Sequence, residues 1–122
     1  MIIPRLVNGV VVFRSAGPCD GPRLSSALEN YYREHDTRDV IWDLRAGQLS
    51  DFAATEFEAV ARTSAKCAIV RGTGARSAFV VDTEIDELLV QAFVGVAGRQ
   101  SPIAFQVFRN INAAWDWLSP SE

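Results

Sequence analysis

The sequence has little of the chemistry from which metal and thiol sites are built. Its 122 residues include one histidine, His35, and two cysteines, Cys19 and Cys67, which stand too far apart for a Cys-x-x-Cys motif. Clustered histidines and cysteines supply most zinc sites, and paired cysteines supply redox centres. The sequence therefore predicts no metal, no cofactor and no redox motif, and we expect both thiols to be reduced.

Long apolar runs and an excess of positive charge are also missing. No apolar run approaches the roughly 20 residues of a membrane helix, and the first residues lack the basic start and apolar stretch of a signal peptide. The basic residues are scattered, and the net charge is −3 with a pI of about 5.1. These features predict a cytoplasmic protein with no membrane span, and they argue against nucleic acid as a partner.

A catalytic constellation is not evident either. A nucleophilic cysteine would need a base, and His35 lies in the polar stretch 34–38, which is typical of a surface loop. Carboxylates without histidine, metal ligands or an activated nucleophile do not specify a reaction. The sequence therefore predicts a protein that is not an enzyme.

The hydrophobic pattern that is present indicates one α/β domain over residues 1–122. The pair Asn8-Gly9 between two β-rich runs predicts an N-terminal hairpin with a type I′ turn. Strands alternate with helices beyond it, which predicts the order ββαβαβαβα: a mainly parallel five-stranded sheet with an antiparallel hairpin and helices packed on it. The expected strands are 3–7, 10–14, 40–44, 78–81 and 103–108, and the expected helices are about 20–35, 50–70, 83–98 and 110–118.

Two details of the helices depend on local signals. Ser50 is expected to be the N-cap of the second long helix. Residues 66–71 could be helix or strand; we favour helix, ending at Gly72 or Gly74, because an apolar helical face continues to Ala68. The buried face of the third long helix is expected to hold Ile85, Leu88, Leu89, Ala92, Phe93 and Val96.

Polar side chains follow the predicted parallel strands. Asp43 and Asp82 each end such a strand, and open α/β sheets bind ligands outside the carboxyl ends of their strands. The alternative is that each aspartate terminates its strand and caps a loop. The candidate binding residues at this edge are Asp43, Arg45, Ser50, Asp51, Asp82 and Thr83.

The strand order and four segments carry a family resemblance. The segments are 40–45 (VIWDLR), 49–51 (LSD), 78–81 (AFVV) and 107–118, which closes the chain with VFRNI, Ala114 and Trp117-Leu118. With them the chain resembles the STAS-like (SpoIIAA-like) group of small bacterial proteins over nearly its whole length. Because these are packing motifs, the resemblance is more specific for fold than for function.

The better-understood members of that group are anti-sigma-factor antagonists, which bind a partner protein and are switched by phosphorylation of a serine. The resemblance places the family's aspartate near Asp51 and its phosphorylated serine near Phe52, where no hydroxyl is present. Ser50 could be modified instead, but its residue type and position favour a helix cap.

The sequence and the resemblance together predict a regulatory domain that binds a protein partner through the end of the third strand and the second long helix. The alternative is a carrier or sensor of a small apolar or anionic ligand, because the fold also resembles lipid-binding Sec14-type domains. In that case Phe57, Phe79, Phe93 and Phe105 could frame a cavity. A homodimer is a further expectation, with Trp115 and the connection 95–101 as the contact.

Overall fold

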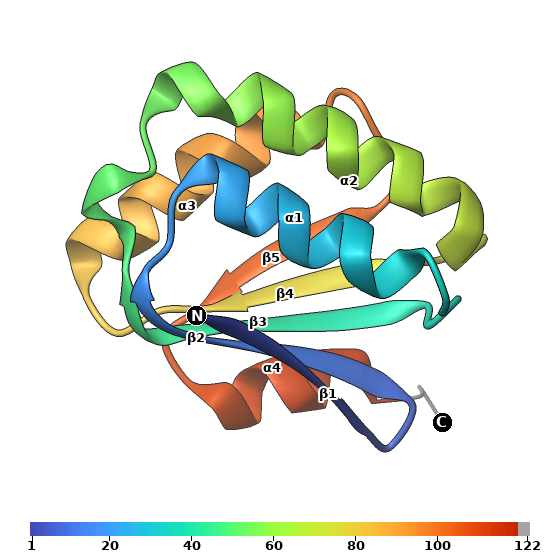
Figure 1. Cartoon of the computed structure of the whole chain (residues 1–122). Coiled ribbons are helices and arrows are strands. Elements are labelled where there is room, and N and C mark those ends of the chain that lie inside the picture. The colour runs from blue at the N-terminus through green and yellow to red at the C-terminus, as the bar shows by residue number, and fades with distance from the viewer. Residues whose placement is uncertain (120–122) are drawn as a thin grey trace.

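Residues 1–119, which a computed structural model describes, form a five-stranded sheet with four α-helices and two short 3-10 helices (Figure 1). The order ββαβαβαβα is the predicted one. The elements are β1 (Ile2–Val7), β2 (Val10–Pro18), α1 (Gly21–Tyr32), β3 (Asp39–Gln48), η1 (Leu49–Asp51), η2 (Ala54–Glu56), α2 (Phe57–Arg71), β4 (Arg76–Val80), α3 (Glu84–Ala97), β5 (Ala104–Phe108) and α4 (Ile111–Leu118).

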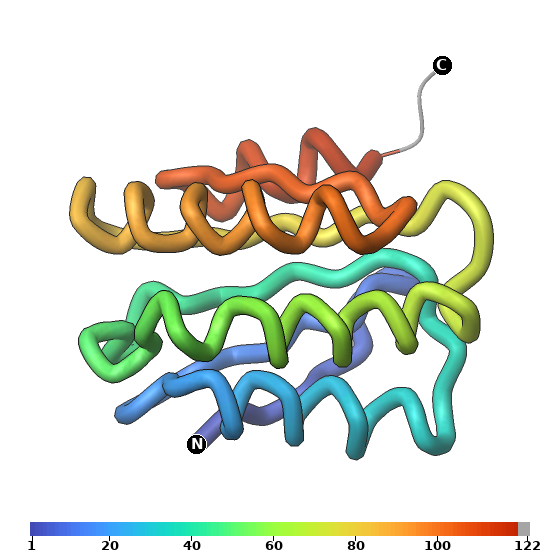
Figure 2. The backbone as a smooth tube through the Cα atoms, turned by 90° about the horizontal axis from the view of Figure 1, so that it is seen from above, coloured from blue at the N-terminus to red at the C-terminus, as the bar shows by residue number. Residues whose placement is uncertain are grey.

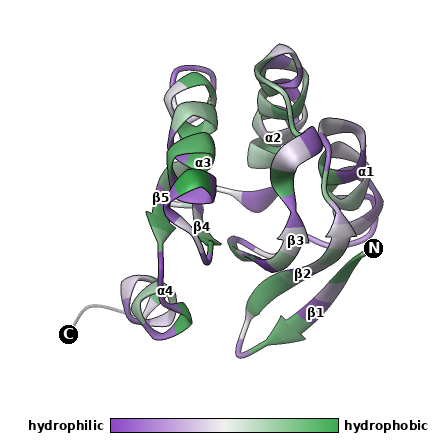
Figure 3. Ribbon diagram, turned by 90° about the vertical axis from the view of Figure 1, so that its left-hand side faces the viewer, coloured by the Kyte–Doolittle hydropathy of each residue, from purple (hydrophilic) through white to green (hydrophobic). Residues whose placement is uncertain are grey.

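The strands lie in the order β1-β2-β3-β4-β5, with β1 antiparallel to β2 and the other neighbours parallel. Helices α1, α2 and α3 run side by side over one face (Figure 2), and α4 covers part of the other face (Figure 3). The larger core lies under the three helices and includes Phe13, Trp42 and Phe79. The smaller core, between the sheet and α4, includes Ile41 and Leu118. The predicted fold class is therefore confirmed.

The N-terminal hairpin has the predicted turn, since Asn8 and Gly9 both adopt positive φ, 50° and 79°. Strand β2 is longer than expected. The predicted end of this strand at Arg14 is wrong, because β2 continues through an irregularity between Arg14 and Ala16 and pairs with β3 as far as Pro18. A bulge of this kind lets a strand with turn-forming residues stay in the sheet.

Helix α1 begins as predicted, with the Asp20 side chain accepting a hydrogen bond from the Arg23 N–H. It ends at Tyr32, so the expected end near His35 is wrong. The hydroxyls of Tyr31 and Tyr32 both bond Thr37, at 2.6 Å to its hydroxyl and 2.8 Å to its carbonyl. These bonds hold the loop against the helix end in a conformation that is not helical.

The predicted start of the second long helix at Ser50 is wrong. Ser50 lies in η1, whose cap makes no side-chain hydrogen bond, and α2 begins at Phe57. Two buried side chains three residues apart, Leu49 and Phe52, anchor the intervening turns. That spacing fits a 3-10 turn as well as an α-helix, so periodicity could not separate them. Residues 66–71 are helical and Gly72 is the C-cap, as predicted.

Helix α3 begins after Thr83, its N-cap, whose hydroxyl accepts from the Asp86 N–H at 3.1 Å. Its buried face is only partly as predicted. Phe93 is buried, but so are Val90 and Ala97, which were not predicted. The predicted residues Ile85, Leu88 and Ala92 are exposed. Apolar residues occur around most of this helix, so the sequence pattern could not fix which of them face the sheet.

Helix α4 begins as predicted at Asn110, whose side chain accepts from the N–H groups of Asn112 and Ala113. The contact predicted for a homodimer, Trp115 with the connection 95–101, differs in the structure. Gly95 lies inside α3 rather than in a connection, and Trp115 is half-buried against the smaller core. Residues 120–122 of the predicted domain lie outside the described ones.

Candidate functional site

Three of the six predicted binding residues lie together at the carboxyl end of the sheet. Asp43, Arg45 and Asp82 line an open pocket of about 360 Å³, together with Arg14 and Ala46. Arg14 lies directly opposite Asp43 in the parallel pairing of β2 with β3. The parallel strands thus bring these side chains to one edge, as expected for the carboxyl ends of such strands.

The pocket is organised by an ion pair between Asp43 and Arg45. The Arg45 guanidinium donates from Nε to Oδ1 and from Nη2 to Oδ2 of Asp43, both at 2.9 Å. These hydrogen bonds lower the pKa of the Asp43 carboxyl, against the opposing effect of its burial, and raise the pKa of Arg45. Asp43 is therefore ionised at neutral pH and fixes one side of the half-exposed Arg45 side chain, which leaves the rest of the guanidinium free for a ligand.

Arg14 is a site residue that sequence analysis missed. Its exposed side chain is close enough to help lower the pKa of Asp43. The available signal was its place at the predicted end of a strand running parallel to the strand of Asp43. The strand of Arg14 belongs to the N-terminal hairpin, and the sequence points to site residues only at the ends of the later strands.

The other three predicted residues do not line the pocket. Thr83 is the N-cap of α3. Ser50 and Asp51 are exposed on η1, which follows β3. They lie beyond the same end of the sheet without contributing to the pocket wall.

Two large apolar side chains are exposed on α3, a few residues after the pocket residue Asp82 in the sequence. Ile85 is 78% exposed and Leu88 is 60% exposed, both in the first half of α3, which begins just after Asp82. Residues three apart on a helix lie on one face, so these side chains form one apolar patch. The edge of the sheet at the carboxyl ends of its parallel strands therefore carries charged and apolar groups together.

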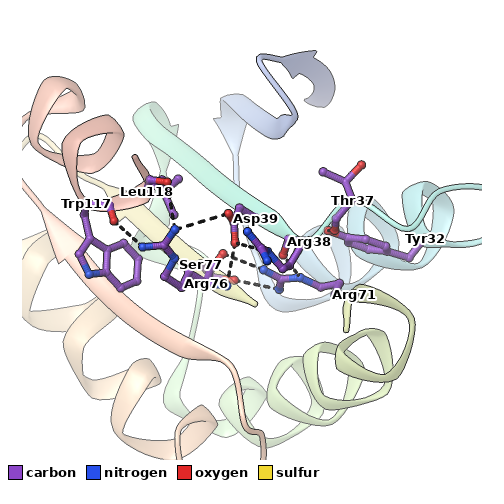
Figure 4. A network of polar contacts seen from close by, with 9 residues as sticks. All are labelled: Tyr32, Thr37, Arg38, Asp39, Arg71, Arg76, Ser77, Trp117 and Leu118. Carbon is purple, nitrogen blue, oxygen red and sulfur yellow. Dashed lines mark hydrogen bonds and ion pairs between the residues drawn. The ribbon is translucent and has the colours of Figure 1, made fainter. Parts of the chain in front are cut away.

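The opposite end of the sheet holds a buried arginine that sequence analysis also missed. Arg71, 4% exposed, donates from Nε to the Arg38 carbonyl at 2.8 Å, from Nη1 to Ser77 Oγ at 2.9 Å and from Nη2 to the Arg76 carbonyl at 2.8 Å (Figure 4). Its guanidinium also stands 5.9 Å from the centroid of the Tyr32 ring. Every group around it is satisfied within the fold, so this network joins α2 to β3 and β4 and is structural.

The interior leaves little room for a ligand. Phe93 lies 5.8 Å from Phe57 and 6.0 Å from Phe79 between ring centroids, and Phe79 stacks on Phe105 at 6.3 Å. The space left among these and neighbouring core residues is about 20 Å³, enough for about one water molecule. The four phenylalanines therefore fill the interior, and the idea that they frame a lipid-sized cavity finds no support in this conformation.

The two cysteines, Cys19 and Cys67, are buried and carry free thiols. Burial raises the pKa of each thiol. His35 is exposed and stacks on Tyr31. Within residues 1–119, no group of three or more His, Cys, Asp or Glu side chains could hold a metal ion, and no helix is long and apolar enough to cross a membrane.

Comparison with known proteins shows the fold. No family model matches the sequence, and no curated protein matches it. A solved structure that is similar is that of an uncharacterised protein of the DUF3478 family with a SpoIIAA-like fold, from Shewanella loihica PV-4. The two chains are 16% identical with a TM-score of 0.55, over 98% of this chain and 93% of the other. The chain has a SpoIIAA-like fold, as the resemblance in its sequence implied.

Proposed function

We propose that the chain is a regulatory domain that acts by binding a protein, and that the partner docks at the carboxyl end of the sheet. The observation that carries the proposal is the exposed pair Ile85 and Leu88 at the same end of the molecule as the charged pocket of Arg14, Asp43, Arg45 and Asp82. Protein interfaces commonly combine an apolar centre with a polar rim, and arginine is enriched in them.

The chemistry of each part favours a protein over a small molecule. The pocket is open and carries both signs of charge, so it has no strong preference for one small ion. Arg45 is held by Asp43 on one side only, which positions it to meet a carboxylate on a partner surface. Ile85 and Leu88 gain burial only if a surface of comparable extent covers them.

The segment between β3 and α2 extends the proposed surface. Ser50 and Asp51 are exposed there, between the buried anchors Leu49 and Phe52. A partner that covers Ile85 and Arg45 would meet this turn as well. We also propose that the protein works in the cytoplasm, where free thiols such as Cys19 and Cys67 stay reduced.

Capture from a native lysate tests the proposal when matched variants are compared. Ile85→Asp places a charge in the proposed surface. Ile69→Asp makes the same change at another exposed isoleucine, 86% accessible, near the C-terminal end of α2 and outside that surface. We expect one protein to be retained by the wild type and by Ile69→Asp and to be lost by Ile85→Asp. Retention by all three proteins, or loss by both variants, contradicts the proposed surface.

A further inference from the structure

The two outer strands of the sheet, β1 and β5, carry very different side chains. Strand β1 contains Pro4, which has no backbone N–H, and the charged Arg5. Both are features that stop an edge strand from pairing with another chain. Strand β5 has the sequence AFQVF, with no charge and no proline. One edge of the sheet is therefore protected and the other is open.

Hydrogen bonds of β5 show which of its backbone groups are free to pair. The Ala104 N–H donates to the Ala75 carbonyl at 3.1 Å, and the Phe108 carbonyl accepts from the Val81 N–H at 3.0 Å. Along a strand, the backbone groups of alternate residues point to opposite sides. The N–H and C=O groups of Phe105 and Val107 therefore point away from β4, toward the outside.

We propose that β5 pairs antiparallel with β5 of a second copy of this chain, about a twofold axis at Gln106. In this register Phe105 lies opposite Val107 of the second copy and Gln106 lies opposite Gln106. The outward groups of Phe105 and Val107 then meet as hydrogen-bonded pairs, giving four backbone bonds across the axis. Each pair also sets an aromatic side chain against a β-branched one, a favourable cross-strand contact. The two sheets join into one of ten strands.

The charges along α3 suit the same arrangement. The first turn of α3 carries Glu84, Asp86 and Glu87, and the exposed Arg99 follows the end of the helix. A twofold axis perpendicular to the sheet sets the two α3 helices antiparallel above the joined strands. The acidic start of each helix then lies toward the Arg99 end of the other, which makes the contact electrostatically self-complementary.

This dimer does not rest on the proposed partner-binding role. It uses the backbone edge of β5, whereas the partner surface uses the carboxyl end of the sheet with Ile85 and Arg45. It also replaces the expected contact through Trp115, which is half-buried against the smaller core.

Cross-linking of the full chain tests the register. Gln106 and Ala104 are both exposed on the same strand. In the proposed pairing two residues at position 106 face each other with Cα atoms about 4.5 Å apart, within disulfide range. Two residues at position 104 are about 13 Å apart along the strands, which is too far for a disulfide.

We expect Gln106→Cys to form a disulfide-linked dimer under mild oxidation and Ala104→Cys to remain unlinked. Equal linking of both variants, or none by Gln106→Cys, overturns the register.

Light scattering and sedimentation equilibrium over a concentration series test the dimer itself. The wild type is expected at twice the 13.4 kDa of one chain. Gln106→Glu sets two like charges opposite each other and is expected to weaken the dimer about fivefold or more. Gln48→Glu makes the same change at an exposed residue of β3, two strands away from β5, and is expected to leave the dimer intact. A wild type that stays monomeric at high micromolar concentration, or a dimer unaffected by Gln106→Glu, contradicts the proposal.

Discussion

Arg76 at the start of β4 donates from both terminal nitrogens to the end of α4, at 2.6 Å to the Trp117 carbonyl and 3.0 Å to the Leu118 carbonyl. The same guanidinium stands 5.6 Å from the centroid of the Trp117 ring. The last carbonyls of a helix have no partners within it. One side chain therefore satisfies two of them and fixes α4 to the sheet.

Replacing Arg76 by methionine should loosen α4. Arg76→Met keeps most of the apolar stem and removes the two donors, so we expect the free energy of unfolding to fall by about 2 kcal/mol. Chemical denaturation monitored by tryptophan fluorescence measures this. Arg99→Met, at an exposed arginine, should change stability by less than about 0.5 kcal/mol. Equal effects of the two substitutions would show that the bonds to α4 are not stabilising.

Arg71 should be far more sensitive to substitution than Arg62, the other arginine of its helix. Arg71→Met leaves Ser77 Oγ and the carbonyls of Arg38 and Arg76 without their donor, so we expect a loss of about 3 kcal/mol. Arg62→Met, on the exposed side of α2, removes only a surface ion pair with Glu58 and should cost less than about 0.5 kcal/mol. A stable Arg71→Met variant would mean that apolar packing replaces the network without loss.

The ion pair of Asp43 and Arg45 predicts an acid-sensitive contribution to stability. The folded-state pKa of Asp43 lies below its ordinary value of 3.8, so the stabilisation is complete above that pH and disappears as the pH falls through the lower, folded-state pKa. We expect wild-type stability to drop from about pH 4 downward more steeply than that of Asp43→Asn. If the free energy of unfolding falls equally steeply with pH in both proteins below pH 4, Asp43 does not make this contribution.

Ser50 should tolerate substitution, although its residue type suggested a helix cap. It lies exposed in η1 and caps no α-helix, so Ser50→Ala is expected to change stability by less than about 0.5 kcal/mol. Asn110 does cap α4, and Asn110→Ala should cost about 1 kcal/mol. Thermal or denaturant unfolding of the two variants compares them directly. A larger loss of stability in Ser50→Ala than in Asn110→Ala would show that Ser50 does cap a helix.

The fold was predictable wherever a local signal had one structural solution. Asn8-Gly9 permits a type I′ turn, and Thr83 and Asn110 cap helices as their types suggest. Prediction failed where two structures share one pattern. Leu49 and Phe52 fit a 3-10 turn as well as a helix start, and α3 is apolar on too many sides for its buried face to be chosen.

The site was predictable only in part, for a related reason. Asp43 and Asp82 each end a predicted strand, and parallel pairing brings such ends together. The predicted end of the third strand at residue 44 is wrong, because β3 continues to Gln48, but Asp43 is the last residue of β3 that pairs with β4. Arg14 ends the predicted strand 10–14 and joins these aspartates because the register of β2 with β3 sets it opposite Asp43, and the sequence alone does not fix that register. Arg71 continues the buried spacing of Ser64 and Ala68 on α2, but a charged side chain at such a position is rarely buried unless specific partners surround it.

Amide hydrogen exchange of the protein with and without its captured partner tests the central claim most directly. The wild-type protein alone, in its own oligomeric state, is the reference, so that protection of β5 by self-association is already present in it. On adding the partner, we expect new protection in the turns at 49–56 and in the first half of α3 around Ile85 and Leu88, and no change at 69–74. Protection at 69–74 without any at 49–56 or in α3 would contradict a partner site at the carboxyl end of the sheet.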